Sequence, residues 1–325
     1  MIPDPAFVAF WRRALAPDQD SGKPPASLEV ANAFAPFLSR PLAYHLAGGD
    51  PTIDAKEAAY RRLAHLRQSQ LVTDLTRSGH SVLPIKGLAN AKRLYRPGWV
   101  RTIGDLDLLL RPADLAAAVD WLQANGYRLM KPPQGWLGVT SDVSFHPLVS
   151  DDGVVEVDLH TAPDAFPLSR ALSAEAVFRD AVTVDGLAVP NTTHTAMIAL
   201  SNLAKERFAP RALRQLIDLG RVAAMEPVDW DAVTRLSERA GLRPALNTAT
   251  GALRQLGTAT ERLPETPDRC GADLARRLLA GRLEPLRAPT KLWREAVWSY
   301  APLTLASIWG HRIAGLITPR SGDPR

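Results

Sequence analysis

Two aspartates lie close together inside a strongly apolar segment of this chain, and few folds can accommodate them there. Residues 81–115 read SVLPIKGLANAKRLYRPGWVRTIGDLDLLLRPADL, with one leucine between Asp105 and Asp107. Alternate residues of a strand share a face, so both carboxylates are expected on one side and Leu106 on the other. Like charges repel, and burying them is costly unless something compensates. The pattern therefore predicts a buried strand with a cation beside it.

A second candidate strand, VVEVDLHTA, starts at residue 154 and alternates in the same way. Glu156, Asp158 and His160 share one face and the apolar residues share the other. Mg²⁺ takes oxygen ligands and is commonly held by one or two carboxylates plus substrate phosphates. We predict Asp105, Asp107 and Asp158 as ligands of a two-metal site, with Glu156 as the alternative to Asp158. Such a site clamps the attacking and leaving oxygens of a phosphoryl or nucleotidyl transfer.

Two alternatives remain open for these side chains. His160 lies one step along the acidic face, where it could orient a carboxylate, contact the substrate or be an ordinary polar residue with satisfied hydrogen bonds. The acids themselves could simply form the solvated face of a sheet. The apolar run after Asp107, the second acid pair and a preceding glycine turn favour the metal site.

That glycine turn is Lys86-Gly87, at the end of an apolar strand and the start of a helix. A helix N-terminus offers free backbone N–H groups and partial positive charge, which suit a phosphate. Gly87 would let the phosphate approach the backbone, and Lys86 would add charge. Arg93, Arg96 and Arg101 follow and are further candidates for phosphate binding. The alternative is that Gly87 only makes the turn and the basic residues face water.

The order of predicted elements gives the fold class. A helix over 54–78, capped by Asp54 and ended by Gly79, precedes strands and helices in alternation up to residue 165, and a hairpin follows with Asp185-Gly186 as its turn.

The chain beyond that hairpin is predicted to be helical, with Thr192 or Thr193 and Asp229 as N-caps and with Gly241 and Gly257 at helix ends. The expected helical spans are 192–207, 211–225, 229–240, 242–257, 271–281 and 290–316. This order indicates an α+β protein: a small mixed sheet flanked by helices, then a helical domain. The expected domains are 1–53, a helical extension, 54–190 and 191–325.

Composition narrows the possible partners and compartment. The net charge of the 325-residue chain is +5 and no block of like charges occurs, which argues against a long nucleic acid as partner. Cys270 is the single cysteine, so an intramolecular disulfide and a cysteine zinc site are excluded, in keeping with a reducing cytoplasm. The N-terminus lacks the pattern of a signal peptide.

No apolar run reaches the roughly 18 residues that a membrane-spanning helix needs. The closest is YAPLTLASIWGHRIAGLITP, which His311 and Arg312 interrupt. We expect it to pack against the body of the protein rather than on a membrane surface.

These motifs together resemble the polymerase-β-like nucleotidyltransferase superfamily, and more closely a bacterial family of uncharacterised nucleotidyltransferases. The resemblance rests on Lys86-Gly87 after an apolar strand, on Arg101 with Asp105 and Asp107, and on Gly126-Tyr127 after the next helix. Asp158-Leu159-His160 looks like the later Asp-x-His of the family. The resemblance covers roughly residues 55–260. The wider superfamily usually has Gly-Ser or Gly-Gly at the turn, where this chain has Lys-Gly.

The resemblance implies a Mg²⁺-dependent transfer of a nucleoside monophosphate from a nucleoside triphosphate, with ATP as the expected donor. Asp105, Asp107 and Asp158 would be catalytic, and Lys86, Gly87, Arg101 and His160 would bind the nucleotide. The acceptor would be a small molecule or a peptide or protein hydroxyl, with an RNA end as a further option. A non-catalytic binding module on the same fold and a metal-dependent phosphohydrolase are the alternatives. Neither the oligomeric state nor the base of the nucleotide follows from the sequence.

Overall fold

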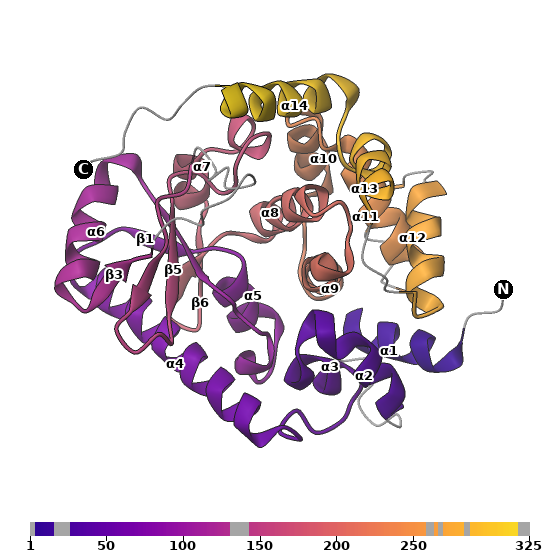
Figure 1. Ribbon diagram of the computed structural model, residues 1–325, viewed down its shortest axis with the longest axis horizontal. Helices are drawn as coiled ribbons and strands as arrows, with labels where there is room; N and C mark the ends of the chain where they lie inside the picture. Colours follow the sequence, from indigo (N-terminus) through magenta and orange to yellow (C-terminus); the bar gives the residue numbers. More distant parts are fainter. Residues whose placement is uncertain are drawn as a thin grey trace.

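A computed structural model describes residues 4–15, 27–130, 143–257, 263–265, 269–282 and 287–317. Figure 1 shows a sheet with its covering helices in one half of the molecule and a group of helices in the other. Helices from the two ends of the chain lie together in the helical half. The expected α+β class is therefore confirmed.

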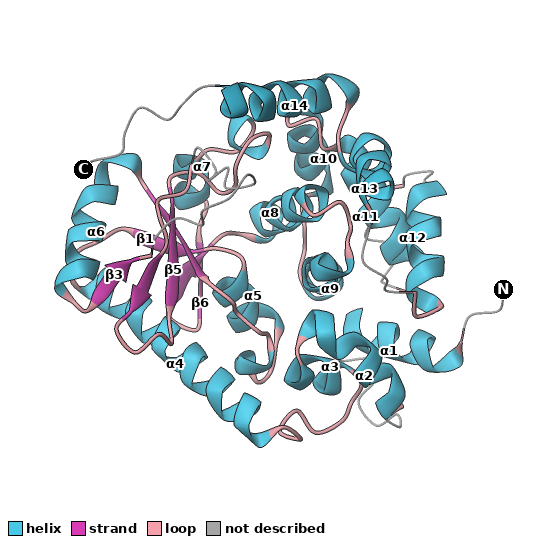
Figure 2. Ribbon diagram, in the orientation of Figure 1, coloured by secondary structure: helices cyan, strands magenta, loops and turns pink. Residues whose placement is uncertain are grey.

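A five-stranded mixed sheet in the order β1-β2-β5-β4-β3 carries the acidic segments (Figure 2). β2 pairs antiparallel with β1 and parallel with β5, and β4 pairs antiparallel with both β5 and β3. A separate hairpin follows the sheet in sequence. The strands are β1 (Val82–Pro84), β2 (Leu106–Leu110), β3 (Tyr127–Leu129), β4 (Leu148–Ser150), β5 (Glu156–His160), β6 (Val182–Val184) and β7 (Leu187–Val189).

Helices make up most of the rest of the described chain. Those of the first half are α1 (Pro5–Leu15), α2 (Leu28–Leu38), α3 (Arg40–Leu46), α4 (Ala55–Arg77), α5 (Gly87–Leu94), α6 (Leu115–Ala124) and α7 (Ala174–Arg179). Those of the second half are α8 (Thr192–Lys205), α9 (Leu213–Met225), α10 (Trp230–Arg239), α11 (Arg243–Gln255), α12 (Arg269–Leu279), α13 (Ala288–Arg294) and α14 (Pro302–Ile317).

The two faces of β2 pack into different cores, which explains its continuous apolar sequence. Leu106 and Leu108 join a cluster with residues of α4 and α6 on one side of the sheet. Leu109 joins a second cluster that continues into the helical half. A strand covered on both faces reads as an apolar run rather than as an alternation. Asp107 lies on the face of Leu109, and its carboxylate is thus directed toward the helical half.

Most predicted elements of the sheet half are confirmed. Asp54 caps α4 by accepting a hydrogen bond from the Glu57 N–H at 3.0 Å. In the β6–β7 hairpin, Asp185 and Gly186 have φ of +46° and +78°, as a tight two-residue turn requires. Gly79, just beyond α4, has φ of +89°.

Two expectations for the helical half are wrong in detail. The N-cap of α8 is Asn191, not Thr192 or Thr193, because the Asn191 side chain accepts the His194 N–H at 2.8 Å. The single helix expected over 290–316 is interrupted: α13 passes into a π turn, Tyr300 is extended, and α14 restarts at Pro302. Pro302 disfavours helical conformation in the residue before it, Ala301, and is itself well suited to the first position of α14, so it favours a restart there. Asp229, Gly241 and Gly257 lie at helix ends as expected.

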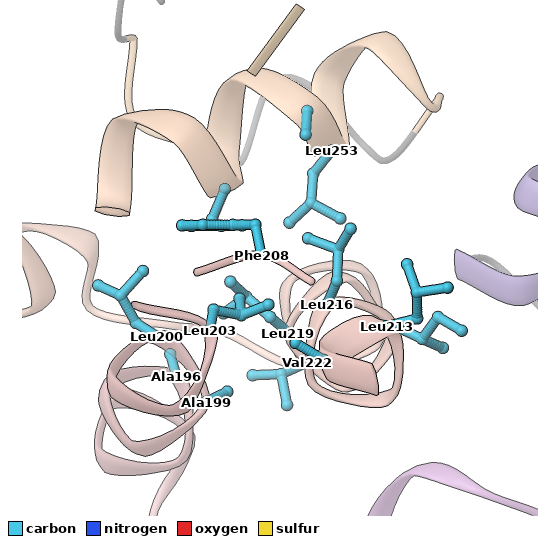
Figure 3. Close-up of a cluster of buried hydrophobic side chains, with 14 of the residues drawn as sticks. Ala196, Ala199, Leu200, Leu203, Phe208, Leu213, Leu216, Leu219, Val222 and Leu253 are labelled. Carbon is cyan, nitrogen blue, oxygen red and sulfur yellow. The ribbon is translucent and has the colours of Figure 1, made fainter. Parts of the chain in front are cut away.

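The core of the helical half is built mainly between α8, α9 and α11 (Figure 3). Leu200, Leu216 and Leu253, one from each helix, are almost completely buried. The same cluster includes α1 and α2, so the first 50 residues pack with the C-terminal helices. The division of the chain into three domains, with boundaries at 53/54 and 190/191, remains a prediction.

The C-terminal helix α14 packs against the body through Ile308, while Leu303 is exposed to solvent. Within the ranges the structure describes, no helix combines the length and apolar character needed to cross a bilayer.

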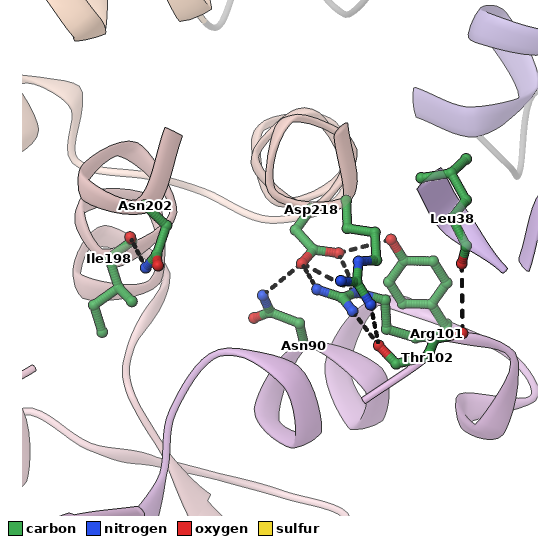
Figure 4. A network of polar contacts seen from close by, with 9 residues as sticks. Leu38, Asn90, Arg101, Thr102, Ile198, Asn202 and Asp218 are labelled. Atoms are coloured by element: carbon green, nitrogen blue, oxygen red, sulfur yellow. Dashed lines mark hydrogen bonds and ion pairs between the residues drawn. The ribbon is translucent and has the colours of Figure 1, made fainter. Parts of the chain in front are cut away.

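Asp218 on α9 ties the helical half to the sheet half (Figure 4). Its carboxylate, almost completely buried, accepts hydrogen bonds from Arg101 Nη2 at 2.6 Å and Arg101 Nε at 3.0 Å. Tyr95 Oη at 2.7 Å and Asn90 Nδ2 at 2.9 Å donate to the same carboxylate. Because α5 supplies Asn90 and the segment before β2 supplies Arg101, this network holds α9 beside the acidic strand.

We expect Asp218→Asn to destabilise the protein strongly. Removal of one partner of a buried ion pair leaves the Arg101 charge uncompensated, which costs about 3–5 kcal/mol. Urea unfolding followed by circular dichroism measures the change. The matched control is Asp120→Asn on exposed α6 surface, which should change the free energy of unfolding by no more than about 0.5 kcal/mol. Equal effects of the two substitutions would contradict the structural role of Asp218.

Candidate metal and nucleotide site

Parallel pairing of β2 and β5 places the two central aspartates side by side. Asp107 and Asp158 are register partners, and residues at one register position of neighbouring strands project to the same face. Asp107 is buried, and Asp158 is half-buried. The sheet therefore presents two adjacent carboxylates toward the helical half.

Asp107 has two close partners, and both contact the same oxygen. Lys86 Nζ lies 2.7 Å and His160 Nε2 lies 2.9 Å from Asp107 Oδ1. Burial alone would raise the pKa of Asp107, but Lys86 and His160 hold it well below its usual range. His160 Nδ1 is in turn 2.9 Å from Ser144 Oγ. If the His160 imidazole donates from Nε2–H to Asp107, its Nδ1 accepts a hydrogen bond from the Ser144 hydroxyl. The ring is then held at both nitrogens and orients the Asp107 carboxylate.

Asp158 lacks the compensation that Asp107 has. Its Oδ1 is buried and has no hydrogen-bond partner among the described residues. Burial, with Asp105 and Asp107 as like charges nearby, raises the pKa of Asp158 to about 6. A divalent cation would supply the missing partner and relieve the repulsion, and carboxylate oxygens are the ligands that Mg²⁺ prefers. The residues present thus fit a bound metal ion.

In the described residues, Asp107, Asp158 and His160 each offer a ligand atom within 4.8 Å of the other two. Asp105 lies outside this group, directly before the first residue of β2, although it lines the same cleft. Asp105 is exposed as a whole residue, but its carboxyl group is surrounded largely by protein atoms. This desolvation raises the pKa of Asp105, and the negative charge of Asp107 raises it further. Glu156 is on β5 but does not line this cleft, whereas Asp158 does.

The Lys86-Gly87 turn has a conformation that brings the lysine back into the site. Lys86 has φ of +58°, unusual for a residue with a side chain, at the N-cap of α5. A Cβ on Gly87 would lie 2.9 Å from Ile103 Cγ2, so close packing requires glycine here. Burial lowers the pKa of Lys86, but Asp107 and Asp164 more than offset it and raise the pKa overall. Lys86 is therefore a fixed cation among the carboxylates.

The three arginines considered for phosphate binding have other contacts. Arg101 lines the cleft, but Asp218 binds its guanidinium. Arg93 is buried away from the cleft and donates from Nη1 to the Pro190 carbonyl at 2.8 Å. Arg96 is exposed and donates to the carbonyl of Tyr95, the residue before it, at 3.0 Å.

A cleft of about 390 Å³ opens over the acidic strands and reaches the helical half. Its lining includes residues that no local sequence pattern marks as functional, namely Ser144, Asp164, Lys205, Glu206, Arg214 and Gln215. Nothing in the local sequence marks Arg214 out from the other arginines of the helical half. Long-range packing alone brings α8 and α9 to the cleft.

Residues 53–257 match the model of a family described as uncharacterised nucleotidyltransferases. No curated protein matches the chain. The matched segment contains β1 to β7 and α4 to α11, hence both the acidic strands and the helical wall of the cleft. The family that the motifs resemble is therefore confirmed.

We expect Asp158→Asn to stabilise the metal-free protein near neutral pH. The pKa of Asp158 in the folded protein is about 6, above the usual value for an aspartate. As the pH rises from about 4 to 6, the folded state therefore loses stability relative to the unfolded state, and this cost persists at higher pH. The amide removes this cost, a gain of roughly 1–2 kcal/mol after allowance for partial solvent screening. Thermal unfolding without metal should show a higher Tm for the variant at pH 7.5 and little difference at pH 4.

Addition of Mg²⁺ or Mn²⁺ provides the second half of this test. The metal should raise the Tm of the wild-type protein and leave that of Asp158→Asn unchanged, because a ligand stabilises only the form that binds it. A less stable variant at pH 7.5, or an equal response of both proteins to metal, would contradict the geometry assigned to Asp158.

Proposed function

Because the chain belongs to the family of uncharacterised nucleotidyltransferases, we propose that it moves a nucleoside monophosphate from a nucleoside triphosphate to an acceptor hydroxyl. The observation that carries this proposal is the Asp107–Asp158 pair: Lys86 and His160 contact Oδ1 of Asp107, whereas Oδ1 of Asp158 is buried and has no hydrogen-bond partner among the described residues. In the reaction the acceptor oxygen forms a bond to the α-phosphorus, the bond between that phosphorus and the bridging oxygen breaks, and pyrophosphate leaves.

Each carboxylate has a proposed role. Asp107 and Asp158 would hold Mg²⁺, with Asp105 at the mouth of the cleft as a further ligand and as the basis for a second ion. A bound Mg²⁺ supplies electrostatic stabilisation of the phosphate oxygens and orients the donor. We expect Asp158 also to help remove the proton of the acceptor hydroxyl, because its carboxylate lines the cleft beside Asp107.

The other predicted residues support the nucleotide. Lys86 and the Gly87 turn would contact the phosphates, and His160 would keep Asp107 in position through its 2.9 Å contact. Arg101 contributes positive charge at the cleft, although Asp218 binds its guanidinium. ATP as donor, a small molecule or a peptide or protein hydroxyl as acceptor, and the cytoplasm as compartment belong to the same proposal.

One observation favours a second candidate function. Lys86 Nζ lies 2.7 Å from Asp107 Oδ1 and compensates this carboxylate from within the protein, which is sufficient for a protein that only binds a nucleotide. Such a binding module would hold the nucleotide without turnover. A phosphohydrolase that uses the same carboxylates would release nucleoside monophosphate and leave no labelled acceptor.

The test uses each of the four α-³²P-labelled nucleoside triphosphates with Mg²⁺ and cell extract as the source of acceptors. We expect label to move to an acceptor with release of pyrophosphate. Asp158→Asn should lose at least about 100-fold in rate, because metal binding contributes several kcal/mol to such transfers. Glu156→Gln, two residues earlier on β5 and outside the cleft, is the matched control and should keep near-wild-type activity.

Three outcomes separate the candidate functions. Labelled acceptor establishes nucleotidyl transfer and identifies the base. Labelled monophosphate alone means hydrolysis. Binding of a nucleotide without turnover in any extract would replace the transferase proposal with the binding module.

A further inference from the structure

The helical half contributes two cationic side chains to the cleft, and neither has a role in the proposed transfer described above. Lys205 is the last residue of α8, and Arg214 lies in the first turn of α9. Both line the same cleft as Asp107 and Asp158. The acidic strands and these cations thus border one space.

Arg214 is a partly buried cation with little compensation. Its Nη1 is 3.5 Å from the Thr102 carbonyl, at the upper limit for a hydrogen bond, and its Nε is buried without a partner among the described residues. Burial, with Arg101 as a like charge nearby, lowers the pKa of Arg214 to about 10. Arg101, by contrast, has its charge matched by Asp218. An anion in the cleft would therefore gain more from Arg214 than from Arg101.

Lys205 is anchored at its tip while its side chain remains half exposed. Its Nζ is 2.9 Å from Asp164 Oδ1, and Asp164 is buried. Lys205 and Lys86 both lower the pKa of Asp164, to about 2, against the opposing effect of burial. An ammonium group has three N–H donors, so contact with one carboxylate leaves donors for a ligand. Asp164 acts here as a positioning residue for the lysine.

We propose that Arg214 and Lys205 bind the β- and γ-phosphates of the donor, so that the helical half supplies the subsite for the leaving pyrophosphate. This inference rests on the proposed function, which places the α-phosphate at the acidic strands. A triphosphate tail carries several negative charges, and the guanidinium of Arg214 can bind phosphate oxygens in bidentate fashion. The cleft would then select nucleoside triphosphates over monophosphates, because only the former reach both cations.

The test measures binding of inorganic tripolyphosphate by isothermal titration calorimetry, with Mg²⁺ and the full-length protein. Loss of a charge-assisted contact should weaken binding by about tenfold to a hundredfold in Arg214→Gln and in Lys205→Gln. Arg235→Gln, an exposed arginine on α10 outside the cleft, is the matched control and should bind as the wild type does. Arg214→Lys should recover only part of the loss, since lysine lacks the planar fork. Thermal unfolding confirms that each variant is folded.

The outcomes for this subsite and for the transferase proposal are separable. Weaker tripolyphosphate binding in Arg214→Gln supports the subsite even if no nucleotide is turned over. Unchanged tripolyphosphate affinity in Arg214→Gln and Lys205→Gln would overturn it even if nucleotidyl transfer is observed. It would equally be overturned if the wild-type protein failed to bind tripolyphosphate, or if Arg235→Gln lost as much affinity as the cleft variants, because the attraction would then be a general effect of basic charge.

Discussion

Two carboxylates at one register position of neighbouring parallel strands are the constraint around which this molecule is arranged. Asp107 and Asp158 face the same space, and their repulsion has to be balanced within the protein. Lys86 and His160 balance Asp107, and they share one of its oxygens. No equivalent group balances Asp158 in the described residues, which leaves a buried oxygen without a hydrogen-bond partner on a residue that lines the cleft. This asymmetry gives one carboxylate that is fixed and charged, and one that is available to a cation or a proton.

The cleft exists because the helical half is held against the sheet half at a defined position. Asp218 achieves this with a buried carboxylate that accepts from Arg101, Tyr95 and Asn90. Replacement of such a network by apolar side chains often costs little stability, and we infer that the network contributes mainly by fixing the position of α9. With α9 fixed in this way, Arg214 in its first turn reaches the cleft. The same contact thus positions the fold and the proposed phosphate subsite.

Local patterns in the sequence were sufficient to predict the acidic strands, the glycine turn, the Asp54 cap and the Asp185-Gly186 hairpin. Each depends on spacing or on backbone preferences within a few residues. The partners of charged residues were not predictable in this way. Arg101 stands four residues before Asp105 and suggested a phosphate ligand, but its partner is Asp218, 117 residues later. Arg214 and Lys205 reach the cleft only through helix packing, for which no local pattern exists. The roles predicted for the site residues therefore remain predictions. The structure adds that Lys86 contacts Asp107 and that Arg101 contacts Asp218.

A crystal structure with Mn²⁺ and a non-hydrolysable nucleoside triphosphate analogue would show where the metal ion and the phosphates bind. We expect an anomalous manganese peak between the carboxylates of Asp107 and Asp158, with the terminal phosphates of the analogue against Arg214 and Lys205. A peak at that position is expected because Asp158 Oδ1 has no hydrogen-bond partner within the part of the chain that the structure describes. Manganese bound elsewhere, or an analogue bound while Asp107 and Asp158 keep only their protein contacts, would contradict the assignment of these carboxylates to metal-dependent nucleotide chemistry.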